Sequence, residues 1–431
     1  MSVASLQLVA AGDEGWDDAR RSWNLAVDQR PTAVVFAESA QDVVAAVRYA
    51  VQRGLRIAFQ GGGHNTGPIA WDGVLLLRTH RMRGIEIDAA GLRARVEAGV
   101  LSDELTTAAA AHGLVFLAGT SPDVGVVGYA VGGGLSWFGR KYGLAANSIL
   151  AAEVVTADGR TLRVGPEREP DLFWALRGGG GNFAAVTALE LRLFPSADVY
   201  AGALFWPLER ASEVLNAWRA WTDAVPEECT SLARLFRAPP PLLGGRSFAM
   251  VELVGGESEL LAPLRALGPE LDTVTRTPVT ALSAINLDPP EPVPYYGEGI
   301  HLEDFDAAAI DALVGAFVPS SLMHFEVRHL GGALARTAPE HGALDAIESP
   351  FTTFAFGLAP DAQSRAAVAH DVEALNAALA PWDGGRRYLN LTESPCDVRT
   401  LFSEQSYERL RKLRTRYDPG SLFCANHQIE P

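Results

Sequence analysis

Three glycine runs in the first half of the chain place the strongest limit on its fold. They are "QGGGHNTG" at 60–67, "GVVGYAVGGG" at 125–134 and "RGGGGNF" at 177–183. Glycine loses more backbone entropy on folding than any other residue, so such runs are expected where backbone must approach something bulky. Each run borders a predicted strand or helix, where free backbone N–H groups can bind an anion. The chain is therefore predicted to hold a large ligand with several phosphate or carbonyl oxygens.

A nicotinamide-binding Rossmann domain is the main alternative for a glycine-rich chain. That domain requires G-x-G-x-x-G directly after a strand and at the start of a helix, with an acidic residue about 20 positions later. Neither "GGGHNTG" nor "GVVGYAVGGG" has this spacing. The Rossmann fold is therefore disfavoured.

The length and patterning of the chain predict two domains. Its 431 residues exceed the about 250–300 that one hydrophobic core reaches. Residues 33–59 are typical of a β-α-β unit, with Ser39 as the helix N-cap and Gly54 at its end. Ser102 is predicted to cap a second helix. Between about 200 and 385, short strands alternate with amphipathic helices, which predicts an α+β domain with a mostly antiparallel sheet.

Composition excludes several classes of function. The net charge is −16, which disfavours binding to nucleic acid or to an anionic membrane surface. Cys229, Cys396 and Cys424 are far apart and show no metal-ligand spacing, so no metal site is expected. The N-terminal segment lacks the pattern of a secretory signal, and no apolar run approaches the about 20 residues of a membrane span. A cytoplasmic protein is expected.

Four segments occur together in one order: "RIAFQGGGHNTG", "GVVGYAVGGGLSWFGRKYGLAANSI", "DLFWALRGGGGNFAAVT" and the C-terminal "YDPGSLFCANHQIEP". In this combination the chain resembles the covalent FAD oxidoreductases of the vanillyl-alcohol-oxidase superfamily, and within it the berberine-bridge-enzyme group. The resemblance implies a two-domain α+β fold of the PCMH type. Residues 1–200, completed by 385–431, would then bind FAD, and residues 201–384 would form a substrate domain on an antiparallel sheet.

The resemblance also assigns a role to the histidine of the first run. In the family, the corresponding ring is bonded through a nitrogen to the 8α-methyl group of the flavin, so His64 is expected to tether FAD. The alternative is a histidine that only forms a hydrogen bond near the flavin. Many relatives carry a second tether from a cysteine, but Ser121 stands at that position, and a single link is expected. In this respect the chain is nearest to the mono-covalent members, among them the 6-hydroxynicotine oxidases that act on D-amines.

The other cofactor contacts implied by the resemblance lie in the glycine loops and their flanks. Besides His64 they are Gln60, Gly61, Gly62, Gly63, Asn65, Gly119, Thr120, Ser121, Val124, Gly125, Gly128, Gly132, Gly133, Gly134, Gly181, Asn182, Phe183, Val186 and Asn390. Val124 matches a position beside flavin C4a, where a small valine goes with reactivity toward oxygen. The alternative for Val124 is an ordinary apolar loop residue.

"SLMHFEVRHLGG" at 321–332 is the leading candidate for the catalytic strand. Strand alternation places His324, Glu326 and Arg328 on one face. In relatives, a matching strand lies over the flavin and supplies an acid or base at the Glu326 position, whereas the amine oxidases have a lysine where His324 stands. The alternative is a solvated sheet face with a surface ion pair.

Two tyrosines complete the candidate catalytic set. "RRYLNLTE" places Tyr388 and Asn390 on one face, and the resemblance makes Tyr388 a base and Asn390 a flavin contact. Leu391 replaces a tyrosine that the family has there, so Tyr388 could instead be a core residue. Tyr142 also matches an active-site position of relatives, with a packing role as the alternative.

These expectations combine into a functional hypothesis. The protein is expected to be an FAD-dependent oxidase that takes hydride from a small amine or alcohol, with O₂ as the acceptor and H₂O₂ as a product. The alternatives are a dehydrogenase of the same fold with another acceptor, a secondary-metabolite tailoring oxidase, and a flavin-binding protein without turnover. The identity of the substrate and the existence of a homodimer stay open.

Overall fold

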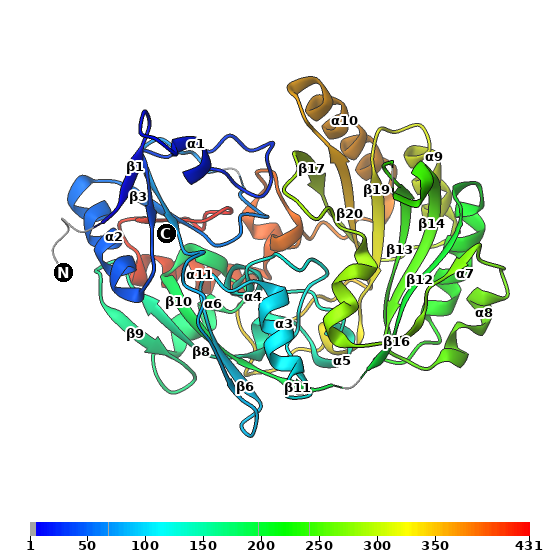
Figure 1. Cartoon of the computed structure of the whole chain (residues 1–431), viewed down its shortest axis with the longest axis horizontal. Coiled ribbons are helices and arrows are strands. Elements are labelled where there is room, and N and C mark those ends of the chain that lie inside the picture. The colour runs from blue at the N-terminus through cyan, green and yellow to red at the C-terminus, as the bar shows by residue number, and fades with distance from the viewer. Residues whose placement is uncertain (1–5, 68, 197, 241) are drawn as a thin grey trace.

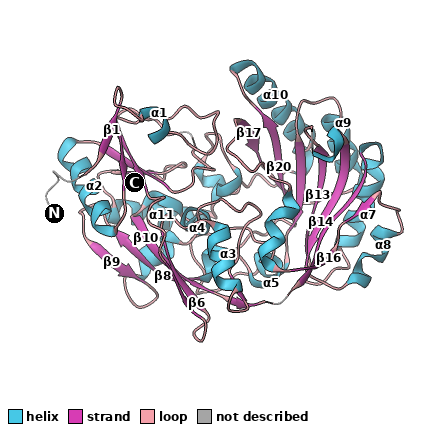
Figure 2. Cartoon of the chain, viewed as in Figure 1, coloured by secondary structure: helices cyan, strands magenta, loops and turns pink. Residues whose placement is uncertain are grey.

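The structure is a computed structural model that describes residues 6–67, 69–196, 198–240 and 242–431. Its first part contains a mostly parallel sheet beside an antiparallel one (Figures 1 and 2). The mostly parallel sheet has the strand order β1 (Leu8–Ala10), β2 (Ala33–Phe36), β4 (Val74–Arg78), β3 (Arg56–Gln60) and β21 (Phe423–Cys424). Only β1 runs antiparallel to its neighbour. The C-terminal strand β21 therefore completes a sheet that the N-terminal half begins.

The predicted unit at 33–59 forms with one difference. Helix α2 (Ala40–Arg53) begins at Ser39, whose side chain accepts a hydrogen bond from the Asp42 N–H, and ends at Gly54 with φ of 65°. The flanking strands β2 and β3 are parallel, as expected, but β4 lies between them. The return strand is therefore not the neighbour of the first, because a later strand inserts into the sheet.

The second sheet is antiparallel throughout. Its order is β5 (Ile85–Asp88), β6 (Arg93–Glu97), β10 (Ala185–Arg192), β8 (Ile149–Val155) and β9 (Thr161–Val164). A short pair, β7 (Leu114–Val115) and β11 (Phe194–Pro195), lies apart from it. The helices of this part are α1 (Trp16–Ala19), α3 (Ser102–Ala110), α4 (Val126–Val131), α5 (Gly139–Tyr142), α6 (Pro170–Leu176) and α11 (Glu404–Tyr417).

The predicted cap of α3 is wrong by one position. Leu101 is the N-cap, and Ser102 is the first helical residue. The Glu104 carboxylate accepts a hydrogen bond from the Leu101 N–H at 2.9 Å, so an acid inside the first turn supplies the polar contact at this helix start.

The remainder of the chain forms a nine-stranded antiparallel sheet covered by helices on one face (Figure 1). Its strands are β15 (Leu271–Asp272), β12 (Val199–Pro207), β14 (Ser247–Val254), β13 (Thr230–Arg237), β19 (His324–His329), β20 (Phe351–Leu358) and β17 (Tyr295–Glu298), with β16 (Thr275–Thr277) on β12 and β18 (His301–Leu302) on β20. The helices are α7 (Ala211–Thr222), α8 (Ala262–Arg265), α9 (Ala307–Phe317) and α10 (Ala362–Ala378). The α+β fold class and the antiparallel sheet are thus confirmed.

Strand alternation decides what each face of this sheet does. On β19, Phe325 and Val327 are buried in the core that α7, α9 and α10 form against the sheet. Glu326, between them, points to the opposite face, which α7, α9 and α10 leave uncovered and which looks toward the first part of the molecule (Figure 1).

The hydrophobic clusters follow a similar division of the chain. One large cluster draws on residues between 33 and 193, on 401–429 and on Ala343, and a second draws on residues between 204 and 379. The domain limits at 200 and 385 stay a prediction, which this arrangement supports.

Candidate active site

A large cavity lies between the glycine-rich loops and the face of the nine-stranded sheet that carries Glu326. Its non-protein space is about 2280 Å³, including its open mouth. The cavity is therefore lined by both parts of the chain.

Two walls of different character enclose it. The glycine wall consists of the loops 60–65, 119–132 and 180–182. The sheet wall consists of side chains from β13, β19 and β20, namely Arg234, Phe236, His324, Glu326, Arg328, Phe354 and Phe356. Tyr388, Leu389 and Asn390, from the C-terminal part of the chain, also line the cavity.

Most of the predicted cofactor contacts lie on the glycine wall or next to it. The ones that line the cavity are Gln60, Gly61, Gly62, Gly63, His64, Asn65, Gly119, Thr120, Ser121, Val124, Gly125, Gly128, Gly132, Gly181, Asn182, Val186 and Asn390. The three loops are far apart in sequence, and the structure brings them to one surface.

The glycine wall fits an oxygen-rich ligand. The backbone N–H groups of residues 62–65 have no hydrogen-bond acceptor among the described residues, and the buried Gln60 Nε2 atom has none either. Unpaired donors of this kind bind phosphate or carbonyl oxygens. A Cβ atom added at Gly128 or Gly181 would meet no protein atom within 4 Å, so the space beside them is open to a ligand. These features fit FAD.

His64 is fixed on several sides. Its ring stacks on Trp23, with ring centroids 4.2 Å apart and an interplanar angle of 19°. The Tyr295 hydroxyl donates to the His64 carbonyl at 2.9 Å. His64 Nε2, the buried ring nitrogen, lies 2.9 Å from Asp123 Oδ1, although the two are not aligned as a hydrogen bond. The ring orientation is therefore determined before any ligand binds.

Asp123 links the histidine to the tryptophan. Its other oxygen, Oδ2, accepts a hydrogen bond from Trp23 Nε1. Burial opposes ionisation, but the contacts with His64 and Trp23 lower the pKa of Asp123 below its usual range. The carboxylate is charged at neutral pH and lies beside Nε2, whereas Nδ1 has no polar partner among the described residues.

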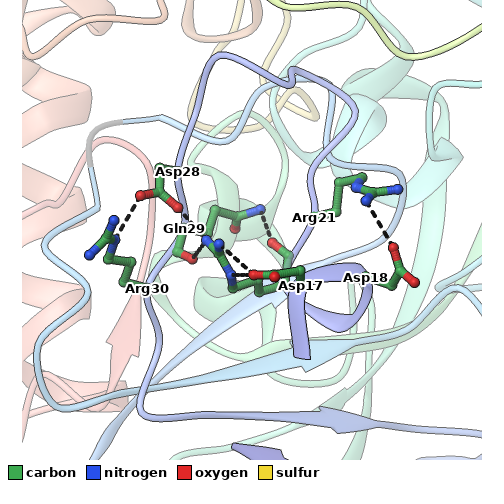
Figure 3. A network of polar contacts seen from close by, with 7 residues as sticks. Asp17, Asp18, Arg21, Asp28, Gln29 and Arg30 are labelled. Carbon is green, nitrogen blue, oxygen red and sulfur yellow. Dashed lines mark hydrogen bonds and ion pairs between the residues drawn. The ribbon is translucent and has the colours of Figure 1, made fainter. Parts of the chain in front are cut away.

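A polar network holds the segment that carries Trp23 (Figure 3). Arg20 pairs with Asp17 at 2.7 Å and donates to the Gln29 carbonyl at 2.8 Å. The Gln29 side-chain amide donates back to the Arg20 carbonyl at 3.0 Å, and Asp28 bridges Arg20 and Arg30. Each exposed ion pair is weak by itself. Together these contacts join residues 17–20 to residues 28–30, on either side of Trp23, whose indole stacks on His64.

The predicted catalytic strand also faces the cavity. His324, Glu326 and Arg328 all line the cavity, which confirms that the three share one face of β19. Their surroundings differ from a solvated surface, because Glu326 has an exposed fraction of only 1%. Arg328 Nη2 and Nε lie 2.6 and 2.7 Å from Glu326 Oε1, and Arg234 Nη2 lies 3.0 Å from Oε2. One carboxylate therefore joins two guanidinium groups.

The charge state of the sheet wall follows from these pairs. Burial opposes ionisation of Glu326, but the charges of Arg328 and Arg234 lower its pKa to about 2. Burial lowers the pKa of His324 to about 3, so this ring is neutral. Glu252, beneath the wall and 3.2 Å from Arg234, has a pKa raised to about 8 by burial. Glu326 is thus a stable anion and a weak base.

Tyr388 lies at the junction of the two walls. It is 3% exposed, and Asn390 Nδ2 donates to its hydroxyl at 3.3 Å. Asn390 Nδ2 also donates to the Tyr129 carbonyl at 3.0 Å, which fixes the amide at the glycine wall. Burial raises the pKa of Tyr388 well above its usual range, although the charge of Arg328 acts in the opposite direction. Tyr388 is therefore a protonated phenol in this structure.

Four predicted site residues lie outside the cavity lining. Tyr142 stacks on Phe194, with centroids 4.1 Å apart, because α5 directs its ring toward β11, so its packing role is the one observed. Phe183 is fully buried in the core. Gly133 and Gly134 have φ of +124° and +78°, and an added Cβ would collide with Tyr388 or with Ala145. Packing and backbone geometry explain these two glycines.

Several cavity residues were missed by reading the sequence. They are Trp23, Asp123, Arg234, Asn286, Asp288 and Glu393. Asp288 accepts hydrogen bonds from Ser121 and Asn286, and so connects the second glycine loop to the sheet side of the cavity. Asp123 stands two residues after Ser121 and could have been noticed there. For the other five, nothing in the neighbouring sequence indicates a place in the cavity.

The described residues contain neither a cluster arranged to hold a metal ion nor a helix suited to cross a membrane. No group of three or more His, Cys, Asp or Glu side chains in these segments is arranged to hold a metal ion. None of the described helices has both the length and the apolar character needed to cross a membrane.

Known families match both ends of this architecture. The family described as FAD binding domain matches residues 31–165, and the family described as berberine and berberine like matches residues 388–430. The first match covers β2 to β9 and the first two glycine runs. The second begins at Tyr388 and includes α11 and β21.

Two relatives match this chain along nearly its whole length. The (R)-6-hydroxynicotine oxidase of Paenarthrobacter nicotinovorans is 30% identical over 99% of this chain and 96% of that protein. The uncharacterized FAD-linked oxidoreductase YgaK of Bacillus subtilis (strain 168) is 28% identical over 99% of this chain and 97% of that protein. The crystal structure of 6-hydroxy-D-nicotine oxidase from Arthrobacter nicotinovorans superimposes with a TM-score of 0.87 at 28% identity, covering 99% and 98% of the two chains. The family expected from the four motifs is confirmed: the chain belongs to the berberine-bridge-enzyme-like FAD-linked oxidoreductases and is an enzyme of the PCMH-type FAD-binding fold.

Proposed function

We propose that this protein is an FAD-dependent oxidase that oxidises a small amine or alcohol, holds its flavin through one covalent bond to His64, and uses O₂ as electron acceptor with formation of H₂O₂. Residues 1–200 with 385–431 would hold FAD, and residues 201–384 would enclose the substrate. When bound, FAD supplies the two-electron acceptor for the substrate's hydride. The observation that carries the proposal is a cavity with unpaired backbone donors and His64 on one wall and a polar sheet face on the other.

The tether is supported by the surroundings of His64. Stacking on Trp23 and the proximity of Asp123 fix the ring, and Nδ1 has no polar partner in the described part of the chain. A neutral imidazole with a free lone pair is the state that a bond to carbon requires. Ser121 donates its hydroxyl to Asp288, which supports a structural role for this position and a single link.

Tyr388 is the best-placed group to handle the substrate's proton. Its hydroxyl can accept a hydrogen bond from the substrate's N–H or O–H and orient the C–H bond that will break. To take up that proton Tyr388 must first be a phenolate, a form that the positive charge of Arg328 favours and burial opposes. Glu326 is a weaker candidate base than the sequence suggests, because two arginines hold it as an anion. Its role here is to position Arg328.

The choice of O₂ rests on Val124 and on the relatives. Val124 lines the cavity on the glycine wall, and its carbonyl accepts a hydrogen bond from the Ser102 N–H at 2.9 Å, which fixes its backbone. Relatives named as oxidases include the 6-hydroxynicotine enzyme and the glucooligosaccharide oxidase of Sarocladium strictum.

A test of the oxidase reaction does not require the natural substrate. The flavin is reduced with dithionite without oxygen, mixed with air-saturated buffer, and followed by its absorbance while peroxide is measured. We expect fast reoxidation with one H₂O₂ per flavin, and about 10-fold slower reoxidation in Val124→Leu, because a larger side chain blocks oxygen access. The same exchange at the exposed Val318 serves as a control. Slow reoxidation of the native protein would favour the dehydrogenase alternative.

A further inference from the structure

The sheet wall combines a partly free cation with aromatic side chains. Arg234 is 1% exposed, and its guanidinium is occupied by Glu326, Glu252 and the Asn286 carbonyl. Arg328 differs, because its side chain is 17% exposed and both of its contacts, through Nε and Nη2, go to Glu326 Oε1. Its Nη1 atom has no acceptor among the described residues. Arg328 therefore presents unused donors to the cavity.

The carboxylates that line the cavity are already engaged. Asp123 contacts His64 and Trp23, and Asp288 accepts from Ser121 and Asn286. Glu326 is shared by two arginines. The fourth, Glu393, is half-buried and accepts a hydrogen bond from Asn24 at 3.4 Å, and burial raises its pKa well above the usual range, which disfavours its charged form. None of the four offers a free negative charge to an ammonium group.

Aromatic rings lie beside Arg328 on the same wall. On the neighbouring strand β20, Phe354 is paired directly with Glu326, and Phe356 is paired with His324. Phe354 is thus a diagonal neighbour of Arg328, a relation that separates side chains by roughly 7–8 Å. The neutral His324 ring stacks on Phe356 at 4.9 Å and 5°. Aromatic and long side chains reach across such a diagonal, so one ligand can contact both Phe354 and the guanidinium.

We propose that the substrate of this enzyme is an aromatic compound that carries a carboxylate, with the ring against Phe354 and Phe356 and the carboxylate bound by Arg328. This inference rests on the proposed function, because it takes the sheet wall as the substrate side of the cavity. An arginine binds a carboxylate through two parallel hydrogen bonds, which a compact ammonium on lysine cannot reproduce. The alcohol or amine that is oxidised belongs to the same molecule, so Arg328 sets the position of the reacting carbon by holding the opposite end.

The test uses three ligands of one size and different charge. Benzoate, the neutral benzamide and the cationic benzamidine are titrated into the flavin-loaded protein by calorimetry. We expect benzoate to bind about 10-fold or more tightly than either of the others, as an added charge-assisted hydrogen bond predicts. Arg328→Met should remove that preference, and Arg328→Lys should keep part of it. Arg246→Met, at an exposed ion pair outside the cavity, is the matched control and should leave all three affinities unchanged.

Each outcome bears on the inference. Tighter binding of benzamidine, equal binding of the three, or no binding of benzoate would overturn it. So would an unchanged benzoate affinity in Arg328→Met with a native flavin spectrum and unfolding midpoint. If Arg328→Met does not fold, the ranking of the three ligands on the native protein decides. The reoxidation experiment uses no ligand, so slow reoxidation with a clear benzoate preference would refute the oxidase and keep the aromatic acid.

Discussion

The two walls of the cavity are built in opposite ways. The glycine wall acts through its backbone, with unpaired N–H groups at residues 62–65 and open space beside Gly181. The sheet wall acts through side chains, with Glu326 shared by Arg234 and Arg328. Backbone donors can serve any ligand with phosphate oxygens, whereas a charged side-chain arrangement selects one kind of substrate. The comparison separates a surface that binds through its backbone from one that binds through its side chains.

The largest expected effect concerns His64, the side chain on the glycine wall that is proposed to bond to the flavin. Replacing His64 by alanine should abolish covalent flavin completely, because the proposed bond is to its ring nitrogen. The measurement is flavin fluorescence of the chain on a denaturing gel after acid precipitation. His112→Ala, at an exposed histidine, should retain full fluorescence.

Asp123→Asn sharpens that result. It keeps the size of the side chain but removes the negative charge beside His64 Nε2, so the covalent fraction should fall several-fold without reaching zero. Fluorescent His64→Ala protein would place the attachment elsewhere. Flavin that washes off the native protein would leave a non-covalent flavoprotein.

The second effect addresses the stability of the sheet wall. Arg234→Met leaves Glu326 with one partner and Glu252 with none, both fully enclosed, so the free energy of unfolding should fall by about 3–5 kcal/mol. Urea unfolding, followed by tryptophan fluorescence, measures the change. Arg246→Met breaks the exposed pair with Glu270 and should cost only about 0–1 kcal/mol. Equal losses in the two variants would show that the buried network does not stabilise the sheet.

The same contrast explains how much the sequence could predict. The glycine wall was recognisable because each of its loops is a local motif, and the resemblance of the motifs gave the order of the loops. Alternation along β19 also sufficed to place His324, Glu326 and Arg328 on one face. These features depend on neighbouring residues only.

What the sequence could not predict depends on pairing over long distances. Arg234 reaches Glu326 because β13 pairs with β19 in a register that puts the two residues opposite each other, 92 positions apart. Trp23 and Asp123 meet across 100 positions. Tyr142 shows the reverse case, since a motif match suggested an active-site residue and the direction of α5 places its ring on Phe194. The fold was therefore more predictable than the charge state of the site.

The smallest expected effect concerns Gly181 and tests whether this position lacks a side chain because FAD lies beside it. Gly181 has φ of −79° and ψ of 19°, and an added Cβ would meet no atom within 4 Å, so Gly181→Ala should raise the free energy of unfolding of the flavin-free protein by about 0.4–1 kcal/mol. In a His64→Ala background, where FAD is exchangeable, the same change should weaken FAD binding about tenfold, or about 1.4 kcal/mol. Gly315→Ala in α9, which also has open space, should stabilise the protein and leave FAD affinity unchanged. A stabilised protein with unchanged FAD affinity in Gly181→Ala would mean that the third glycine loop does not touch the cofactor, and that its glycines, like Gly133 and Gly134, serve the path of the chain.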